Sequence, residues 1–177
     1  MNNSRSITCF SLISSLICLA APVAAGEPAR PFDEFGQTDA VSLRVEQVDG
    51  EHWIAMVELS NDESIAAMTL PLRWRPKGGF FRLDSASYDG LRTEQFALKT
   101  FYPDSVKQTV LIGLISDLGT GLPPLPPGDG PIARLHFTTL GISPKPLDVD
   151  TTFIRPHNVL QMVTPDVSSI LPVFERR

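Results

Sequence analysis

Hydrophobic and polar residues alternate along several segments of this chain, most regularly in residues 68–75. There the apolar positions are Met68, Leu70, Leu72 and Trp74, and the positions between them are Thr69, Pro71, Arg73 and Arg75. A second segment repeats the pattern, with Ala133, Leu135 and Phe137 alternating with Arg134, His136 and Thr138. Successive side chains of a β-strand point to opposite faces of a sheet. A period of two therefore predicts two strands, each with a buried face and a solvated face.

The first two strands are expected to form a hairpin around Asp49-Gly50. Apolar residues alternate up to this dipeptide in residues 41–45 and away from it in residues 53–59. An Asp-Gly pair between two alternating runs is typical of a tight hairpin, because both central residues of such a turn take positive φ. The sequence thus predicts that these two strands pair in antiparallel fashion.

Nine short strands are predicted in total, at residues 41–45, 53–59, 68–74, 81–88, 95–101, 106–116, 131–140, 147–154 and 159–163. No segment has the periodicity of a long helix. The chain contains 16 prolines, which lie between the apolar runs and agree with an all-β sandwich because proline is excluded from the interior of a ladder. The segment Gly119–Pro131, rich in Pro and Gly, is interpreted as a surface loop in preference to a polyproline docking peptide.

Two segments of the chain are similar to those of cohesin-like domains. These are NDESIAAMTLPLRW at residues 61–74, with the spacing I-x-x-M-x-L-x-L-x-W, and GDGPIARLHFTTLG at residues 128–141. The resemblance extends from about Val41 to Leu140. It implies a single nine-stranded jelly-roll β-sandwich that binds another protein through one open sheet face and uses no cofactor. A dockerin-like protein or another exported protein would be the partner.

The first 25 residues have the organisation of a secretory signal peptide. Arg5 provides a positive charge, residues 7–21 are apolar apart from Ser and Thr, and residues 23–25 are small. An apolar run of about fifteen residues is shorter than the roughly twenty that a membrane-spanning helix needs. The sequence therefore predicts export to the periplasm or the cell exterior, with no membrane anchor in the mature form.

Cleavage is expected between Ala25 and Gly26. The mature chain that remains is expected to have two parts. Residues 26–39 contain Pro, Gly and charged residues without apolar periodicity, so they are interpreted as a flexible lead-in. Residues 40–177 are then expected to form the cohesin-like domain. This mature chain is long enough to bury a substantial core as one domain.

The cysteine content predicts whether the mature protein has disulfides, and the net charge bears on the class of partner. The only cysteines, Cys9 and Cys18, lie in the signal peptide, so the mature protein is expected to have no thiol and no disulfide. The full chain has a net charge of −5, and cleavage removes the positive charge of Arg5. Nucleic acid is excluded as a partner because phosphate binding needs a basic surface.

The sequence lacks the usual catalytic and metal-binding motifs, which predicts a protein that is not an enzyme and holds no metal. The serine hydrolase motif Gly-x-Ser-x-Gly is absent. The three histidines, His52, His136 and His157, do not have metal-ligand spacing. The acids that could form a catalytic pair are Glu58, Asp62, Glu63, Asp84, Asp89 and Glu94, and they are interpreted as solvated residues of turns. Asp148-x-Asp150 is not followed by the ligands of a calcium loop.

Two surfaces are candidates for binding. The outward row Thr69, Arg73 and Arg75 is the predicted partner-binding patch, because arginine is enriched in protein interfaces. The alternative is a carbohydrate-binding module in which aromatic side chains stack on sugar rings. The candidate aromatics for that function are Phe80, Tyr88, Phe96, Phe101 and Tyr102. Protein binding is favoured because both tryptophans have inward parity.

Overall fold

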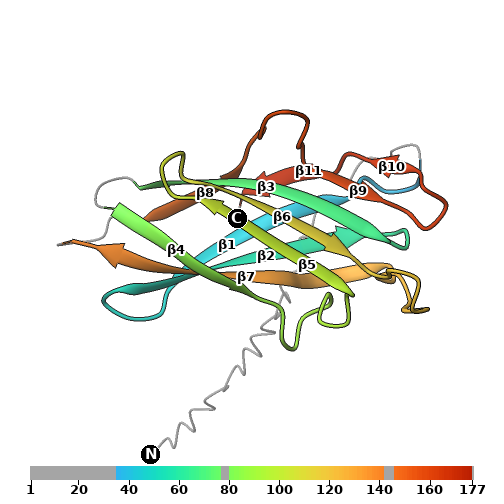
Figure 1. The fold of residues 1–177 in the computed structure, drawn as a ribbon, viewed down its shortest axis with the longest axis horizontal. Helices are drawn as coiled ribbons and strands as arrows, with labels where there is room; N and C mark the ends of the chain where they lie inside the picture. Colours follow the sequence, from blue (N-terminus) through green and yellow to red (C-terminus); the bar gives the residue numbers. More distant parts are fainter. Residues whose placement is uncertain (1–34, 77–79, 142–145, 177) are drawn as a thin grey trace, which may run out of the picture.

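A computed structural model describes residues 35–76, 80–141 and 146–176, which form eleven strands and no helix (Figure 1). The strands are β1 (Ala40–Gln47), β2 (His52–Asn61), β3 (Ala67–Pro76), β4 (Phe80–Ser87), β5 (Leu98–Asp104), β6 (Thr109–Ile115), β7 (Gly128–Leu140), β8 (Leu147–Thr151), β9 (Gln161–Val163), β10 (Ser169–Ile170) and β11 (Val173–Arg176). The sequence predicts nine strands. The two additional ones, β10 and β11, are short and lack a regular alternation of apolar residues.

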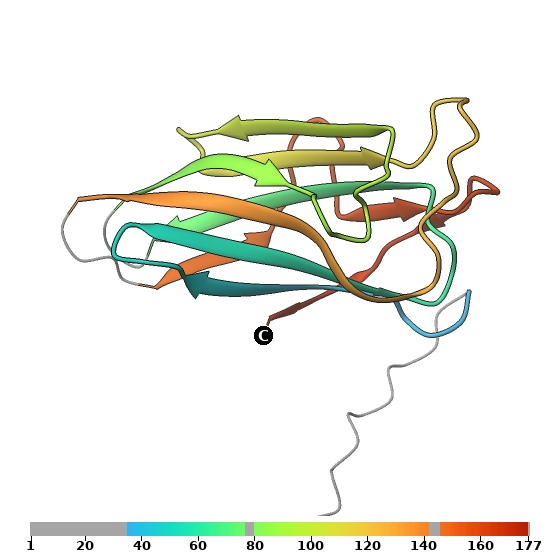
Figure 2. The same ribbon diagram turned by 90° about the horizontal axis from the view of Figure 1, so that it is seen from below.

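The strands form two sheets that stack face to face (Figure 2). One sheet has the order β11-β1-β2-β7-β4, and the other has the order β10-β9-β3-β6-β5. Strand β8 also belongs to the second sheet and pairs with β3 beside β9. The two are called here the five-stranded sheet and the six-stranded sheet. The predicted all-β sandwich is confirmed.

The core between the sheets contains the inward residues that the alternation predicts. Met68, Leu70, Leu72 and Trp74 of β3 are each exposed by 2 % or less. The inward residues of β7 are buried in the same way. Both tryptophans pack edge-to-face against phenylalanines, Trp53 against Phe81 and Trp74 against Phe137, with ring centroids 5.7 Å apart in each pair. The predicted inward parity of both tryptophans is confirmed.

The hairpin between β1 and β2 is confirmed, but its turn differs from the predicted one. The strands pair in antiparallel register from Ala40 opposite Ser60 to Gln47 opposite Trp53, which leaves a loop longer than two residues. Gly50 is not among the described glycines with positive φ. The side chain of Asp49 closes the loop instead, because its Oδ1 accepts the N–H groups of Glu51 at 2.8 Å and of His52 at 2.9 Å.

The segment rich in Pro and Gly before β7 is a surface loop over residues 116–127, as predicted, but it ends earlier than expected. Strand β7 begins at Gly128, inside the predicted turn, and pairs there with the end of β2. Gly128 and Gly130 have φ values of 145° and 139°, which favour glycine. The side chain of Arg92 lies against both glycines, and its guanidinium donates to the carbonyl of Gly128 at 2.9 Å and to that of Leu59 at 3.0 Å.

The predicted signal peptide, residues 1–25 with its cleavage site at Ala25 and Gly26, lies outside the described residues, as do residues 26–34 of the predicted lead-in. Residues 35–39 run beside the connection between β2 and β3, where the N–H of Gln37 donates to Asp62 Oδ2 at 2.7 Å. In the described ranges, no helix has the length and hydropathy needed to cross a membrane.

Candidate binding face

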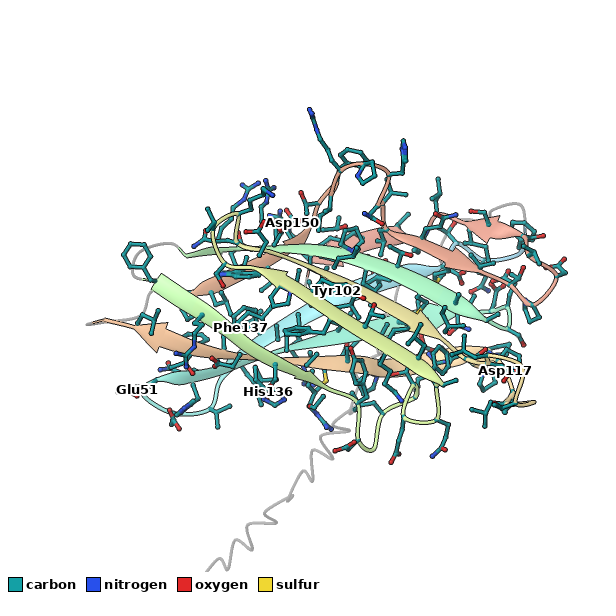
Figure 3. All side chains as sticks on the ribbon, in the orientation of Figure 1. Glu51, Tyr102, Asp117, His136, Phe137 and Asp150 are labelled. Atoms are coloured by element: carbon teal, nitrogen blue, oxygen red, sulfur yellow. The ribbon has the colours of Figure 1, made fainter. Side chains whose placement is uncertain are left out.

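The outer side of the six-stranded sheet exposes a group of apolar side chains among polar ones. Alternation directs Leu98 and Tyr102 of β5, Leu111 and Ile115 of β6, and Val163 of β9 away from the core. Tyr102 of β5 is 65 % exposed and is labelled in Figure 3. Gly113 has no side chain to add to this surface. A Cβ at this position would lie only 2.7 Å from Oγ1 of Thr100 on the neighbouring strand.

A groove of about 480 Å³ lies on this surface, between the β5–β6 hairpin and the loop that joins β8 to β9. Its lining residues are Tyr102, Asp104, Lys107, Thr109, Leu111, Phe153, Ile154, Arg155 and Asn158. Phe153 is 55 % exposed, although it is a large apolar side chain. Two aromatic side chains therefore stand in solvent at the groove. The groove and the outward residues around it are called here the groove face.

The loop between β8 and β9 projects because the two strands pair with different parts of β3. β8 pairs with Leu72–Pro76, and β9 pairs with Ala67–Thr69, so the neighbour of β3 is interrupted beside Pro71. A proline is tolerated at this position because it has no N–H to donate to a ladder. Its carbonyl still accepts the N–H of Thr152 at 3.0 Å. The interruption releases residues 152–160, which form a loop that extends beyond the edge of the sheets at the top of Figure 1.

Charged groups line the groove from both the β5–β6 hairpin and the β8–β9 loop. Asp104 and Lys107 form an ion pair at 2.9 Å across the turn between β5 and β6. Hydrogen bonds from the backbone and side chain of Lys107 lower the pKa of Asp104. Arg155 is exposed on the opposite wall. The lining of the groove thus combines apolar side chains with charges of both signs.

The predicted patch Thr69, Arg73 and Arg75 lies on the outward side of β3. Arg73 pairs in register with Thr109 of the groove lining, so it adjoins the groove, and Arg75 is exposed near the end of the strand. Arg73 is only partly exposed, and its Nε is buried without a hydrogen-bond partner within the described chain. Sequence analysis did not single out Phe153, because no periodic pattern marks an isolated loop residue.

The outer side of the five-stranded sheet is more polar. Arg44 pairs with Glu58 at 3.6 Å, and Arg82 pairs with Asp84 at 2.5 Å. Burial alone would raise the pKa of Asp84, but hydrogen bonds from Thr138 and Arg82 outweigh it and lower the pKa. His136 of β7 shares a hydrogen bond with Ser87 at 2.8 Å, as its outward parity allows. This surface is called here the charged face.

The five aromatic residues considered for sugar binding do not form a row. Phe96 is buried, and Tyr88 and Phe101 pack partly against the core. The two that are well exposed lie on different sheets, Phe80 on β4 and Tyr102 on β5. The arrangement does not give the flat platform of several rings on one sheet that the carbohydrate interpretation requires.

Three carboxylates meet at one end of the sandwich. Asp39, Asp62 and Glu63 each place an oxygen within 4.8 Å of the others. Burial, followed by the negative charge of Asp39 and the contact with Asp62, raises the pKa of Glu63 to about 8. The interpretation of Glu63 as a solvated turn acid is wrong, because both of its carboxylate oxygens are buried. Sequence analysis missed Asp39, which lies far from the other two in the sequence.

No protein-family model matches the chain, and no curated protein sequence matches it. The fold is similar to that of cohesin domains in solved structures. The sixth cohesin of scaffoldin B from Acetivibrio cellulolyticus, solved in complex with a mutant Cel5 dockerin, aligns with a TM-score of 0.59 and 12 % identity over 78 % of this chain and 95 % of that one. The cohesin of the Coh-OlpA-Doc918 complex from Clostridium thermocellum gives 0.60 and 12 % over 78 % and 94 %.

A non-cellulosomal cohesin from the archaeon Archaeoglobus fulgidus aligns with a TM-score of 0.51 and 13 % identity, over 78 % of this chain and 86 % of that one. Each of the three alignments covers most of the length of the solved cohesin. The sandwich is therefore cohesin-like in fold, as the two strand segments predict. At this level of identity, the likeness concerns the fold alone.

Proposed function

We propose that this chain is a secreted, non-catalytic protein-binding module whose groove face binds an exported partner of the dockerin type. The observation that carries the proposal is the groove of about 480 Å³ with Tyr102 and Phe153 exposed beside it. Large aromatic side chains are the usual anchors of protein interfaces. The two cohesins cited above that were crystallised with dockerins support the choice of partner class.

Export is part of the same proposal. It is supported by the charged, apolar and small-residue regions of residues 1–25. The mature protein would begin at Gly26 and contain no cysteine. A module of this kind needs no disulfide, because its core is filled by apolar residues from both sheets.

The groove face is also suited to a protein by its size and chemistry. A standard interface buries roughly 800 Å² on each partner, with an apolar centre and a polar rim. Tyr102, Leu111 and Phe153 supply the apolar centre, and Asp104, Lys107 and Arg155 supply the rim. A carbohydrate-binding module is the alternative function, and the separation of Phe80 from Tyr102 disfavours it.

The experiment is an affinity capture with the exported protein, whose first residue should be Gly26. Dockerin domains and the producing cell's exported fraction serve as probes, compared for wild type and the double variant Tyr102→Ala, Phe153→Ala. Removing two anchors should weaken binding by about 2 kcal/mol or more, roughly thirtyfold in Kd.

Phe80→Ala is the matched control, because Phe80 is 69 % exposed but lies on the other sheet. It should bind as wild type does. Equal binding by the double variant would remove the groove face from the proposal. Retention by insoluble polysaccharide, with no protein captured, would favour the carbohydrate alternative.

A further inference from the structure

The three carboxylates at the end of the sandwich converge because of the pairing of β1 with β2. Asp39 immediately precedes β1, while Asp62 and Glu63 immediately follow β2. In the antiparallel register Ala40 lies opposite Ser60, so the residues just beyond these positions meet. Figure 2 shows the segment before β1, in blue, at the same end of the sandwich as the connection between β2 and β3.

The local backbone is built around Asp62. Its N–H donates to Oδ1 of Asp39 at 3.2 Å, and its own Oδ2 accepts the N–H of Gln37 at 2.7 Å. Gly36 has a φ of 149°, and a Cβ there would lie 2.3 Å from Oδ2 of Asp62. Only glycine lets the backbone approach the carboxylate this closely. The backbone of the turn before β1 therefore packs directly against the carboxylate of Asp62.

Glu63 provides an independent observation that points to a ligand. Its side chain is partly exposed, but both carboxylate oxygens are buried, and neither accepts a hydrogen bond from an N–H or O–H donor of the described residues. The side chain is directed toward Asp39, which is itself only 1 % exposed, and toward Asp62. A buried carboxylate without donors is strongly unfavourable, and neighbouring carboxylates add repulsion. A bound cation would remove both costs.

We propose that Asp39, Asp62 and Glu63 bind a calcium ion. Oxygens that bind one calcium ion at about 2.4 Å can be no more than about 4.8 Å apart, and the three carboxylates meet this limit. The donors are all carboxylate oxygens, with no His or Cys in the cluster, which is the set that hard cations prefer.

Further ligands to the ion can come from water and from the adjoining polar pocket of about 140 Å³. Ser60 and Asp129 line this pocket together with Asp39 and Asp62. Calcium accepts six to eight oxygen ligands in a flexible geometry, so a site completed in this way suits it. The ion would fasten the segment before β1 to the connection between β2 and β3. This site is separate from the groove face and does not rest on the proposed function.

Titration calorimetry on the exported protein, stripped with EDTA and then given calcium chloride, tests the site. One calcium ion should bind per chain, and Tm should rise by about 5 to 10 °C at a hundredfold excess of calcium over Kd. Glu63→Gln should bind calcium at least tenfold more weakly. Glu46→Gln is the control, because Glu46 is an exposed acid on the same β1–β2 hairpin and should bind as wild type does.

The sign of the stability change separates a metal ligand from a residue with a purely structural role. In EDTA, Glu63→Gln should melt at a higher temperature than wild type, because it removes the cost of burying an ionisable carboxyl group beside two other acids. In calcium, the order should reverse. Wild type without a calcium response, or Glu63→Gln with wild-type affinity, would overturn the proposal. An equal response to magnesium alone at the same concentration would overturn the assignment to calcium.

Discussion

The two outer faces of the sandwich cover the same core. They differ in whether their outward side chains already have partners within the sheet. On the charged face, the ion pairs Arg44–Glu58 and Arg82–Asp84 place opposite charges next to each other within the sheet. On the groove face, Tyr102 and Phe153 stand in solvent.

The difference indicates which face gains from a partner. Burying the charged face would strip water from groups that already have partners, and this desolvation offsets much of any new interaction. Burying the groove face removes apolar surface from water, which is favourable by about 25 cal/mol per Å². Both faces are outward rows of ordinary strands. The alternation of inward and outward residues is the same on both faces, so only the chemistry of the outward side chains distinguishes them.

The largest expected effect tests the assumption that the two faces share one core and differ only in their outward residues. Leu72 of β3 is fully buried beneath the groove face. Leu72→Ala should lower the free energy of unfolding by about 2–5 kcal/mol, because it leaves a cavity. Chemical denaturation followed by tryptophan fluorescence measures this loss.

Arg75→Ala, on the same strand but exposed, is the control. Its effect should stay within about 0.5 kcal/mol. If the two variants were equally destabilised, the assignment of inward and outward positions on β3 would be wrong, and with it the composition of the groove face.

The smallest expected effect concerns the charged face. Asp84 lies at an irregularity in the pairing of β4 with β7 and accepts a hydrogen bond from Thr138 at 2.6 Å. Its pKa is lower in the folded state, so it adds stability above its unfolded pKa of about 3.9. This contribution is lost as pH falls through the folded pKa.

Asp84→Asn should therefore cost about 0.2–1 kcal/mol at pH 7, as a partly exposed pair does, and this difference should vanish in acid. Melting temperatures of both proteins from pH 7 down to pH 2 measure it. Partner capture should not change, because the pair lies on the charged face. A difference that grew as the pH fell would contradict the direction of the pKa shift.

The sequence was sufficient to predict most of the fold, because burial enforces alternation. A shift of one residue in β3 would expose Leu70 and Leu72 and bury Arg73, so the pattern determines the orientation of the strand. The short strand β11 could not be predicted in this way. It forms by pairing in parallel with β1, and its four residues carry no pattern of their own.

The candidate sites were less predictable, since both depend on contacts between distant residues. Arg73 was placed on the correct side of its strand, but Phe153 reaches the groove only because β3 loses its neighbour beside Pro71. Glu63 follows a polar turn and resembles a solvated acid in sequence. Its burial depends on Asp39, which belongs to a different part of the chain.

Hydrogen–deuterium exchange on the complex with the captured partner shows which face binds, because it compares both faces in one experiment. We expect slower exchange in β5, in β6 and in residues 152–160, and unchanged exchange in β2 and β7. Slower exchange in β2 and β7, with β5, β6 and residues 152–160 unchanged, would contradict it and place the partner on the charged face.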